Sequence, residues 1–180
     1  MKKKLKIAGL LTLMLIGGCG DLADEDQTNE GLTVHDTTDI KQLVHDYSIG
    51  KLKNDTASIT SEQLIVTHAD ASETIYELPK DEFFVSFAPY INQTHPCTNH
   101  SLTGCQGELV DEEMTVRIED KNGNVVFDEK TKTQANGFID FWLPKNEEYH
   151  MTVVMDEKTA TLDFSTFTGD NTCITTLQLG

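Results

Sequence analysis

Residues 114–127, MTVRIEDKNGNVVF, predict a β-hairpin. From Met114 to Ile118 apolar residues alternate with polar ones, as in a strand that buries one face. Asn122-Gly123 then supplies a turn, because both residue types tolerate the positive φ angles of a tight hairpin. We therefore expect an antiparallel sheet to extend from this hairpin.

The alternation continues toward the C-terminus. Further strands are predicted within 138–143, 149–155 and 160–164, and a final strand places Cys173 on one face with Leu177. Short strands at this spacing are typical of an antiparallel sandwich or a partly open barrel. Residues 91–180 are therefore predicted to form a β-rich, sandwich-like domain that carries the cysteines.

Residues 36–90 have a different pattern. Apolar residues recur at helical spacing between Thr37 and Ile49, and extended segments are predicted at 63–67, 73–78 and 83–87. This is the pattern of a small helix-plus-strands region. The predicted fold class is α+β, with this region preceding the β-rich domain.

Residues 1–18 resemble a bacterial lipoprotein signal. A run of lysines precedes an apolar stretch that is short for a membrane span, and small residues lead directly to Cys19. The resemblance implies cleavage before Cys19 and lipid attached to its sulfur. Ordinary secretion, with Cys19 as a spare thiol, is the alternative. Residues 19–35 are acidic and poor in apolar groups, so we expect a flexible tether.

The charge balance excludes one class of partner. Beyond Gly18 the chain holds 10 basic and 30 acidic residues, a net charge of −20. Nucleic-acid binding is not expected, because phosphate contacts need clustered lysine and arginine. No arrangement of serine, histidine and aspartate indicates an enzyme.

Three cysteines remain after Cys19, namely Cys97, Cys105 and Cys173, and an odd number is unusual outside the cytoplasm. They allow a Cys97–Cys105 disulfide, or a disulfide from Cys173 to one of the other two. They also suit a Cu(I) site, because Cu(I) favours soft thiolate ligands. We expect the three to converge, with at least one pair at disulfide range. His95 and His100 could assist with Cu(II), although a histidine in a polar loop is usually solvated.

Three motifs resemble the CueP family of periplasmic copper-binding proteins. They are HPCTNHSLTGCQGE at 95–108, NGFIDFWLP at 136–144 and GDNTCITT at 169–176. The resemblance covers essentially all of the predicted exported part, and its specific portion is the cysteine loop. It implies that Cys97, Cys105 and Cys173 bind the copper.

The resemblance also implies a function and partners. It implies a protein that buffers copper outside the cytoplasm, contributes to copper resistance, and passes the metal to a client such as a superoxide dismutase. An extracytoplasmic thiol reductase would keep the thiols reduced, and reduction of Cu(II) by the thiols stays open. The signal for a lipid anchor departs from a soluble periplasmic protein and predicts attachment to the outer side of the cell membrane. A homodimer stays open. The alternative function is a surface-anchored interaction module with a structural disulfide and no metal.

Overall fold

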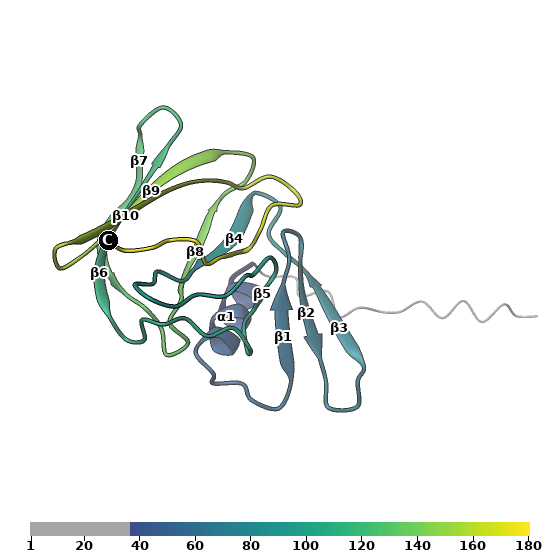
Figure 1. The fold of residues 1–180 in the computed structure, drawn as a ribbon. Coiled ribbons are helices and arrows are strands. Elements are labelled where there is room, and N and C mark those ends of the chain that lie inside the picture. Colours follow the sequence, from purple (N-terminus) through teal and green to yellow (C-terminus); the bar gives the residue numbers. More distant parts are fainter. Residues whose placement is uncertain (1–36) are drawn as a thin grey trace, which may run out of the picture.

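The computed structural model describes residues 37–180 and consists there of one helix followed by short strands (Figure 1). The helix is α1 (Thr37–Ser48), and the strands are β1 (Thr56–Ile59), β2 (Gln63–Thr67), β3 (Glu73–Glu77), β4 (Glu82–Phe87), β5 (His100–Ser101), β6 (Glu113–Asp120), β7 (Val125–Lys132), β8 (Ile139–Pro144), β9 (Glu148–Met155), β10 (Lys158–Ser165) and β11 (Cys173–Ile174). The predicted signal, Cys19 and the tether lie outside the described residues.

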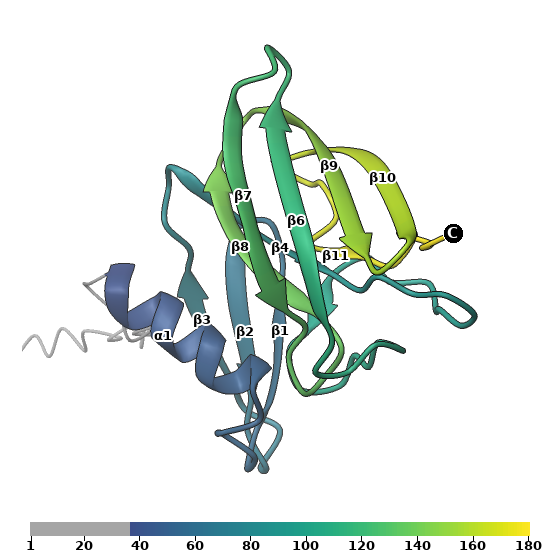
Figure 2. The ribbon, with the colours of Figure 1, turned by 90° about the vertical axis from the view of Figure 1, so that its left-hand side faces the viewer.

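The strands form three sheets, with orders β3-β2-β1-β5, β10-β9-β6-β7 and β11-β4-β8. The β11-β4-β8 sheet lies between the other two (Figure 1). Seen from the side, the four long strands β6, β7, β9 and β10 form a twisted layer, and α1 lies on the opposite side of β8 (Figure 2). The α+β fold class predicted from the sequence is confirmed.

The predicted hairpin is present as β6 and β7. The strands pair antiparallel, and Gly123 in the turn has a φ of 81°. Met114, Val116 and Ile118 are buried against the middle sheet, as their alternation predicts.

Strand β4 belongs to both cores of the molecule. Its sequence EFFVSF is almost continuously apolar, which is the pattern of a strand buried on both faces. Phe83, Val85 and Phe87 pack into the core beneath β6 and β9. Phe84, on the other face, packs with α1, β1 and β2. The strand thus joins the sandwich to the helical region, so the two regions share their packing.

Helix α1 contributes a narrow apolar stripe to the second core. Ile40, Val44 and Tyr47 are buried at a spacing of about one helical turn, while most of the other residues of the helix are polar. The stripe packs on Leu64 and Val66 of β2. This packing fixes α1 beside β8, where Ser48 reaches the middle sheet.

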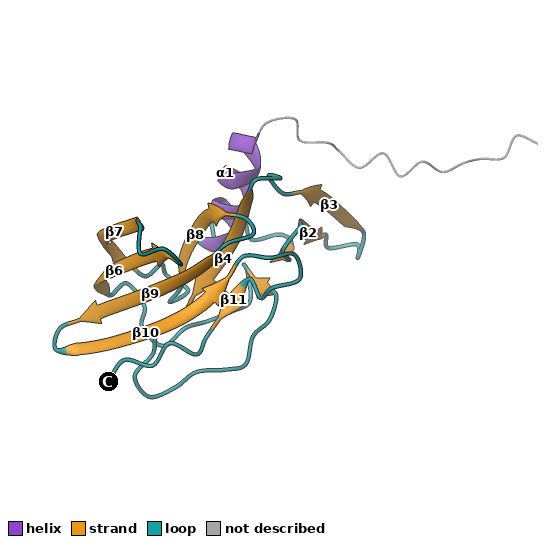
Figure 3. Ribbon diagram, turned by 90° about the horizontal axis from the view of Figure 1, so that it is seen from above, coloured by secondary structure: helices purple, strands orange, loops and turns teal. Residues whose placement is uncertain are grey.

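Two strand pairings differ from the sequence expectation. The final strand is short and runs parallel to β4, with Cys173 opposite Ser86, whereas an antiparallel arrangement was expected. Strand β1 was not predicted, and it pairs with β5 from the distant cysteine loop. Both pairings join segments that are far apart in the chain. They place the cysteine loop and the C-terminal strand side by side. Figure 3 shows β11 next to β4.

Candidate metal centre

The cysteine loop, residues 92–108, contains the small strand β5, which pairs with β1. Ile59 of β1 lies opposite His100, and Ser58 lies opposite Ser101. This pairing directs the His100 side chain into the interior, where it is fully buried. Cys97 and Cys105 lie on either side of β5 and are both partly buried.

The C-terminal strand docks along the first part of this loop. The Cys173 N–H donates to the carbonyl of Thr98 over 3.0 Å, and the Thr175 hydroxyl donates to the carbonyl of His95 over 2.6 Å. Cys173 itself is 1% exposed. The buried position follows from the alternation of the last strand, in which Cys173, Thr175 and Leu177 face inward.

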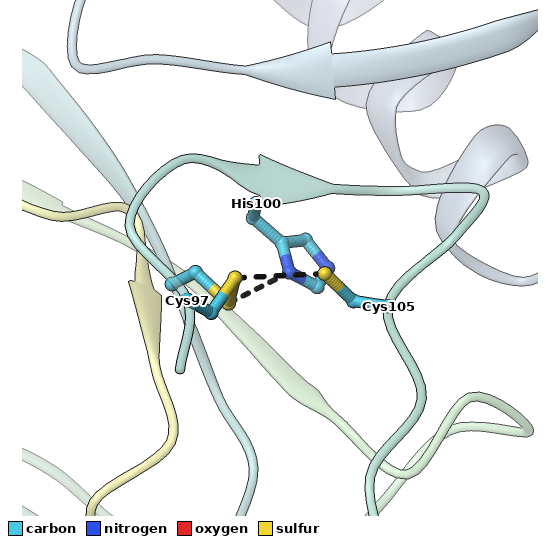
Figure 4. Close-up of side chains that lie close together, drawn as sticks. Cys97, His100 and Cys105 are labelled. Atoms are coloured by element: carbon cyan, nitrogen blue, oxygen red, sulfur yellow. Dashed lines mark hydrogen bonds between the residues drawn. A yellow bond between two sulfur atoms is a disulfide. The ribbon is translucent and has the colours of Figure 1, made fainter. Parts of the chain in front are cut away.

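The three cysteines and His100 form one cluster. Cys97 and Cys173 are joined by a disulfide with a Cα–Cα distance of 5.5 Å. The free sulfur of Cys105 lies 3.5 Å from that of Cys97, and His100 Nδ1 lies 3.4 Å from the sulfur of Cys173. All four ligand atoms lie within 4.8 Å of one another. The predicted convergence of the cysteines is confirmed, and Figure 4 shows Cys97, His100 and Cys105 pointing toward one another.

The expectation of a solvated side chain is wrong for His100. Its ring lies between the phenyl rings of Phe138, with centroids 4.5 Å apart, and Phe84, at 6.3 Å. Burial lowers the pKa of His100 to about 4, despite the nearby carboxylate of Asp140, which acts in the opposite direction. The imidazole is therefore neutral at neutral pH, which is the form that binds metals. Its Nε2 has no hydrogen-bond partner within residues 37–180.

His95 lies outside the cluster. Its ring packs edge-on against that of Phe138, with the two centroids 6.4 Å apart. It does not belong to the group of ligand atoms formed by the cysteines and His100. The structure thus separates two histidines that the sequence analysis treated alike.

Sequence reasoning missed a hydrogen-bond network around Asp140, whose carboxylate acts electrostatically on His100. Asp140 accepts hydrogen bonds from Ser48 of α1 and Ser86 of β4, both over 2.6 Å. Gln134 donates to the same carboxylate over 3.1 Å. An acid in the middle of the apolar run at 138–143 is a signal that could have identified this buried network. Phe138 offered no such signal, because an apolar residue on a strand reads simply as core.

The cluster offers soft metal ligands, and two of its sulfurs can be either joined in a disulfide or reduced to thiols. Three sulfurs and one imidazole nitrogen match the ligands that copper and zinc take in proteins. The disulfide engages two of the three sulfurs, and thiolates are the metal-binding form of cysteine. The cluster can thus exist in a disulfide form and in a reduced form that offers every donor.

No helix within residues 37–180 is long and apolar enough to cross a membrane.

Comparison with known proteins agrees with these features. The family model described as "Periplasmic copper-binding protein CueP" matches residues 40–178. A solved structure described as "Crystal Structure of S.CueP" is similar to the chain, with a TM-score of 0.74 and 36% sequence identity. The similarity covers 84% of this chain and 92% of that one. A search of curated proteins found no match. The chain belongs to the CueP family of periplasmic copper-binding proteins, which is a family of binding proteins and not of enzymes.

Proposed function

We propose that the reduced chain binds one Cu(I) ion through Cys97, Cys105 and Cys173 and acts as an extracytoplasmic copper buffer. The observation that carries the proposal is the convergence of three sulfurs from a loop and a distant strand within one 4.8 Å group. His100 belongs to the same group and is placed to supply a fourth donor.

The donor set favours Cu(I) over other ions. Thiolates are soft ligands, and Cu(I) accepts a shell of only three of them. Zn(II) prefers four tetrahedral ligands, so its binding depends on His100 joining the three sulfurs. Oxygen donors are absent from the group of ligand atoms found in residues 37–180, so Mg(II) and Ca(II) are poor candidates.

The Cys97–Cys173 disulfide makes the proposed site conditional on reduction. In the disulfide form, Cys105 is the one cysteine within residues 37–180 that retains a free thiol. Copper binding outside the cytoplasm therefore needs a reductant that converts the disulfide to thiols, and an extracytoplasmic thiol reductase is suitable for this. Transfer of the bound copper to a client such as a superoxide dismutase completes the proposed role, and the partly exposed Cys97 and Cys105 mark the side from which a client would approach.

A second function is favoured by the disulfide itself. Cys97–Cys173 ties the loop to the last strand across 76 residues and can serve a purely structural purpose. In that case the chain is an interaction module at the cell surface, and Cys105 has no ligand to bind.

A competition titration separates the two functions. The fully reduced chain is titrated with Cu(I) against a colorimetric Cu(I) chelator without oxygen. We expect one Cu(I) per chain, and a large loss of affinity when any one of the three cysteines becomes serine, because a hydroxyl is a hard and poorly ionised donor. Cys173→Ser binding as the wild type would contradict the three-thiolate site. A reduced chain that takes no copper would favour the interaction module.

We also propose that Cys19 carries a lipid that anchors the protein to the cell membrane. The support is the order of charged, apolar and small residues before Cys19 in the sequence. Cys19→Ala should release the protein from the membrane fraction. If the variant stays with membranes as the wild type does, another feature holds the protein there.

A further inference from the structure

We infer that Cys105 exchanges with the disulfide, moving it from the buried pair Cys97–Cys173 to the loop pair Cys97–Cys105. This inference rests on the proposed function, because it describes how Cys173, a proposed copper ligand, is released. It assigns Cys105 a second role as the thiol that opens the site.

The positions of the three sulfurs carry the inference. The Cys105 sulfur lies 3.5 Å from the sulfur of Cys97, which is the atom bonded to Cys173. Cys97 and Cys105 also belong to one loop, whereas Cys173 lies on a strand in the sheet of β4 and β8. Cys105 is therefore already beside the atom it would attack.

The exchange balances without any outside reagent. The Cys105 sulfur, as thiolate, attacks the Cys97 sulfur and forms a new S–S bond. The Cys97–Cys173 bond breaks, and the Cys173 sulfur leaves with the electron pair and takes up the proton that Cys105 gave away. The number of disulfides is unchanged, so nothing is oxidised or reduced overall.

The exchange moves the disulfide from a buried cysteine to two cysteines that are partly exposed. Cys173 is 1% exposed and lies under the loop, while Cys97 and Cys105 are both partly exposed. After the exchange, the disulfide joins two loop residues that an outside dithiol protein can approach. That partner then supplies two electrons, reduces Cys97–Cys105 and is itself oxidised to a disulfide. Cys173 thus becomes a free thiol beside His100 without direct contact with the reductant.

The test maps disulfides in the full chain carrying Cys19→Ser, without copper and without oxygen. Free thiols of the oxidised protein are blocked with one alkylating reagent after an acid quench, and the remaining cysteines are reduced and labelled with a second. No lysine or arginine lies between Lys80 and Arg117, so trypsin leaves Cys97 and Cys105 on one peptide, apart from Cys173. Fragmentation of that peptide then shows whether Cys105 was free or whether both of its cysteines were in the disulfide, and the label on the Cys173 peptide shows whether Cys173 was free.

We expect two forms in the mapping experiment. One has Cys105 free and the other has Cys173 free, and their ratio is the same at every protein concentration because the exchange is intramolecular. In Cys105→Ser only the Cys97–Cys173 form remains. A small dithiol should reduce this disulfide at a rate lower than that of the parent by a factor of about ten or more. Gln106→Ala is the matched control, since it changes the exposed neighbour of Cys105 and keeps all three sulfurs.

The opposite results overturn the inference. They are a protein in which Cys105 is the single free thiol under all conditions, or a Cys105→Ser variant reduced as fast as the parent. Cys105→Ala repeats the rate measurement with a different side chain, and circular dichroism confirms that both variants fold. Because copper is absent, the result is independent of the proposed function: if the reduced protein binds Cu(I) and the oxidised protein shows no exchange, only this inference fails.

Discussion

Gly107 lies so close to Gly137 that neither position has room for a side chain. A Cβ atom on Gly107 would be 2.5 Å from the carbonyl oxygen of Gly137, and one on Gly137 would be 2.7 Å from that of Gly107. The Gly107 N–H also donates to the carbonyl of Asn136 over 2.7 Å. This contact fastens the end of the cysteine loop, just after Cys105 in the sequence, to the turn before β8.

Gly137→Ala should therefore destabilise the fold more than an alanine at an uncrowded turn. Gly169 provides the matched control, because it also has a positive φ, 89° against 79° for Gly137, but no atom within 4 Å of an added Cβ. Both variants share the backbone strain of an alanine at positive φ, and only Gly137→Ala forces two backbones apart. We expect an additional loss of about 1–3 kcal/mol in the free energy of unfolding, measured by urea denaturation. Equal losses of unfolding free energy in the two variants would show that the Gly107 and Gly137 backbones can move apart at little cost.

The start of the same loop is closed by Glu108, and this contact should depend on pH. Its carboxylate accepts the backbone N–H groups of Ile91 over 2.6 Å and Asn92 over 2.9 Å. The hydrogen bond from the Asn92 N–H, followed by that from Ile91, lowers the pKa of Glu108 to about 2, from an ordinary value of 4.5. Because the folded-state pKa is depressed, the stabilisation is complete above pH 4.5 and is lost as the pH falls toward 2.

Glu108→Gln should accordingly be less stable than the wild type at pH 6, and the difference should shrink by pH 3. Urea midpoints at the two pH values measure it. Glu112→Gln is the control, since its carboxylate takes part in no hydrogen bond or ion pair within residues 37–180. A Glu108→Gln deficit of the same size at both pH values would mean that the charge of Glu108 is not what holds the loop.

His100 and His95 should differ in their effect on copper affinity. His100 Nδ1 lies within the cluster of sulfurs, whereas His95 packs against Phe138 and is not a member of the cluster. In a Cu(I) competition titration of the reduced chain, His100→Ala should weaken binding by about tenfold or more, whereas His95→Ala should leave it near the wild-type value. Thermal melts of both apo variants show whether the cavity left by His100 has also loosened the fold. An affinity loss that is larger for His95→Ala would place the metal elsewhere on the loop.

The Cys97–Cys173 disulfide should stabilise the protein in the absence of copper. It closes a long stretch of chain, with a sequence separation of 76, and so restricts the unfolded state. The oxidised chain should be about 2–4 kcal/mol more stable than the reduced chain in urea denaturation with a copper chelator present. The Cys105→Ser variant should show the same difference in stability between its oxidised and reduced forms, because it retains both Cys97 and Cys173. Identical midpoints for the oxidised and reduced chains would contradict the prediction.

Much of the fold could be predicted because its elements have local signals. The Asn122-Gly123 turn, the alternation in β6 and the stripe of α1 each depend on residues close together in the sequence. The convergence of Cys97 and Cys173 was also predictable, from a long polar loop and a strand that begins at a cysteine. These are statements about single segments and their ends.

What could not be predicted depends on pairing between distant segments. His100 stands among polar residues, so its local sequence indicates a solvated loop, and it is buried because β5 pairs with β1 across more than forty positions of chain. The parallel pairing of β11 with β4 is of the same kind. The sequence pattern of a strand in either pair does not indicate which strand it pairs with. Such contacts are fixed by packing of the whole molecule and are not encoded in any one window of sequence.

The parallel strand β11 has a consequence for how the molecule matures. A chain made and exported from its N-terminus presents Cys97 and Cys105 together, while Cys173 follows 76 residues after Cys97. Among the cysteines of residues 37–180, the two loop cysteines therefore come first in the chain. Strand β4 packs with residues of β1 and β2 through Phe84 and pairs with β11 along one edge. The last strand of the chain thus supplies both the edge of the middle sheet and the third sulfur of the cluster, so a chain cut short before β11 would keep Cys97, His100 and Cys105 but lack Cys173.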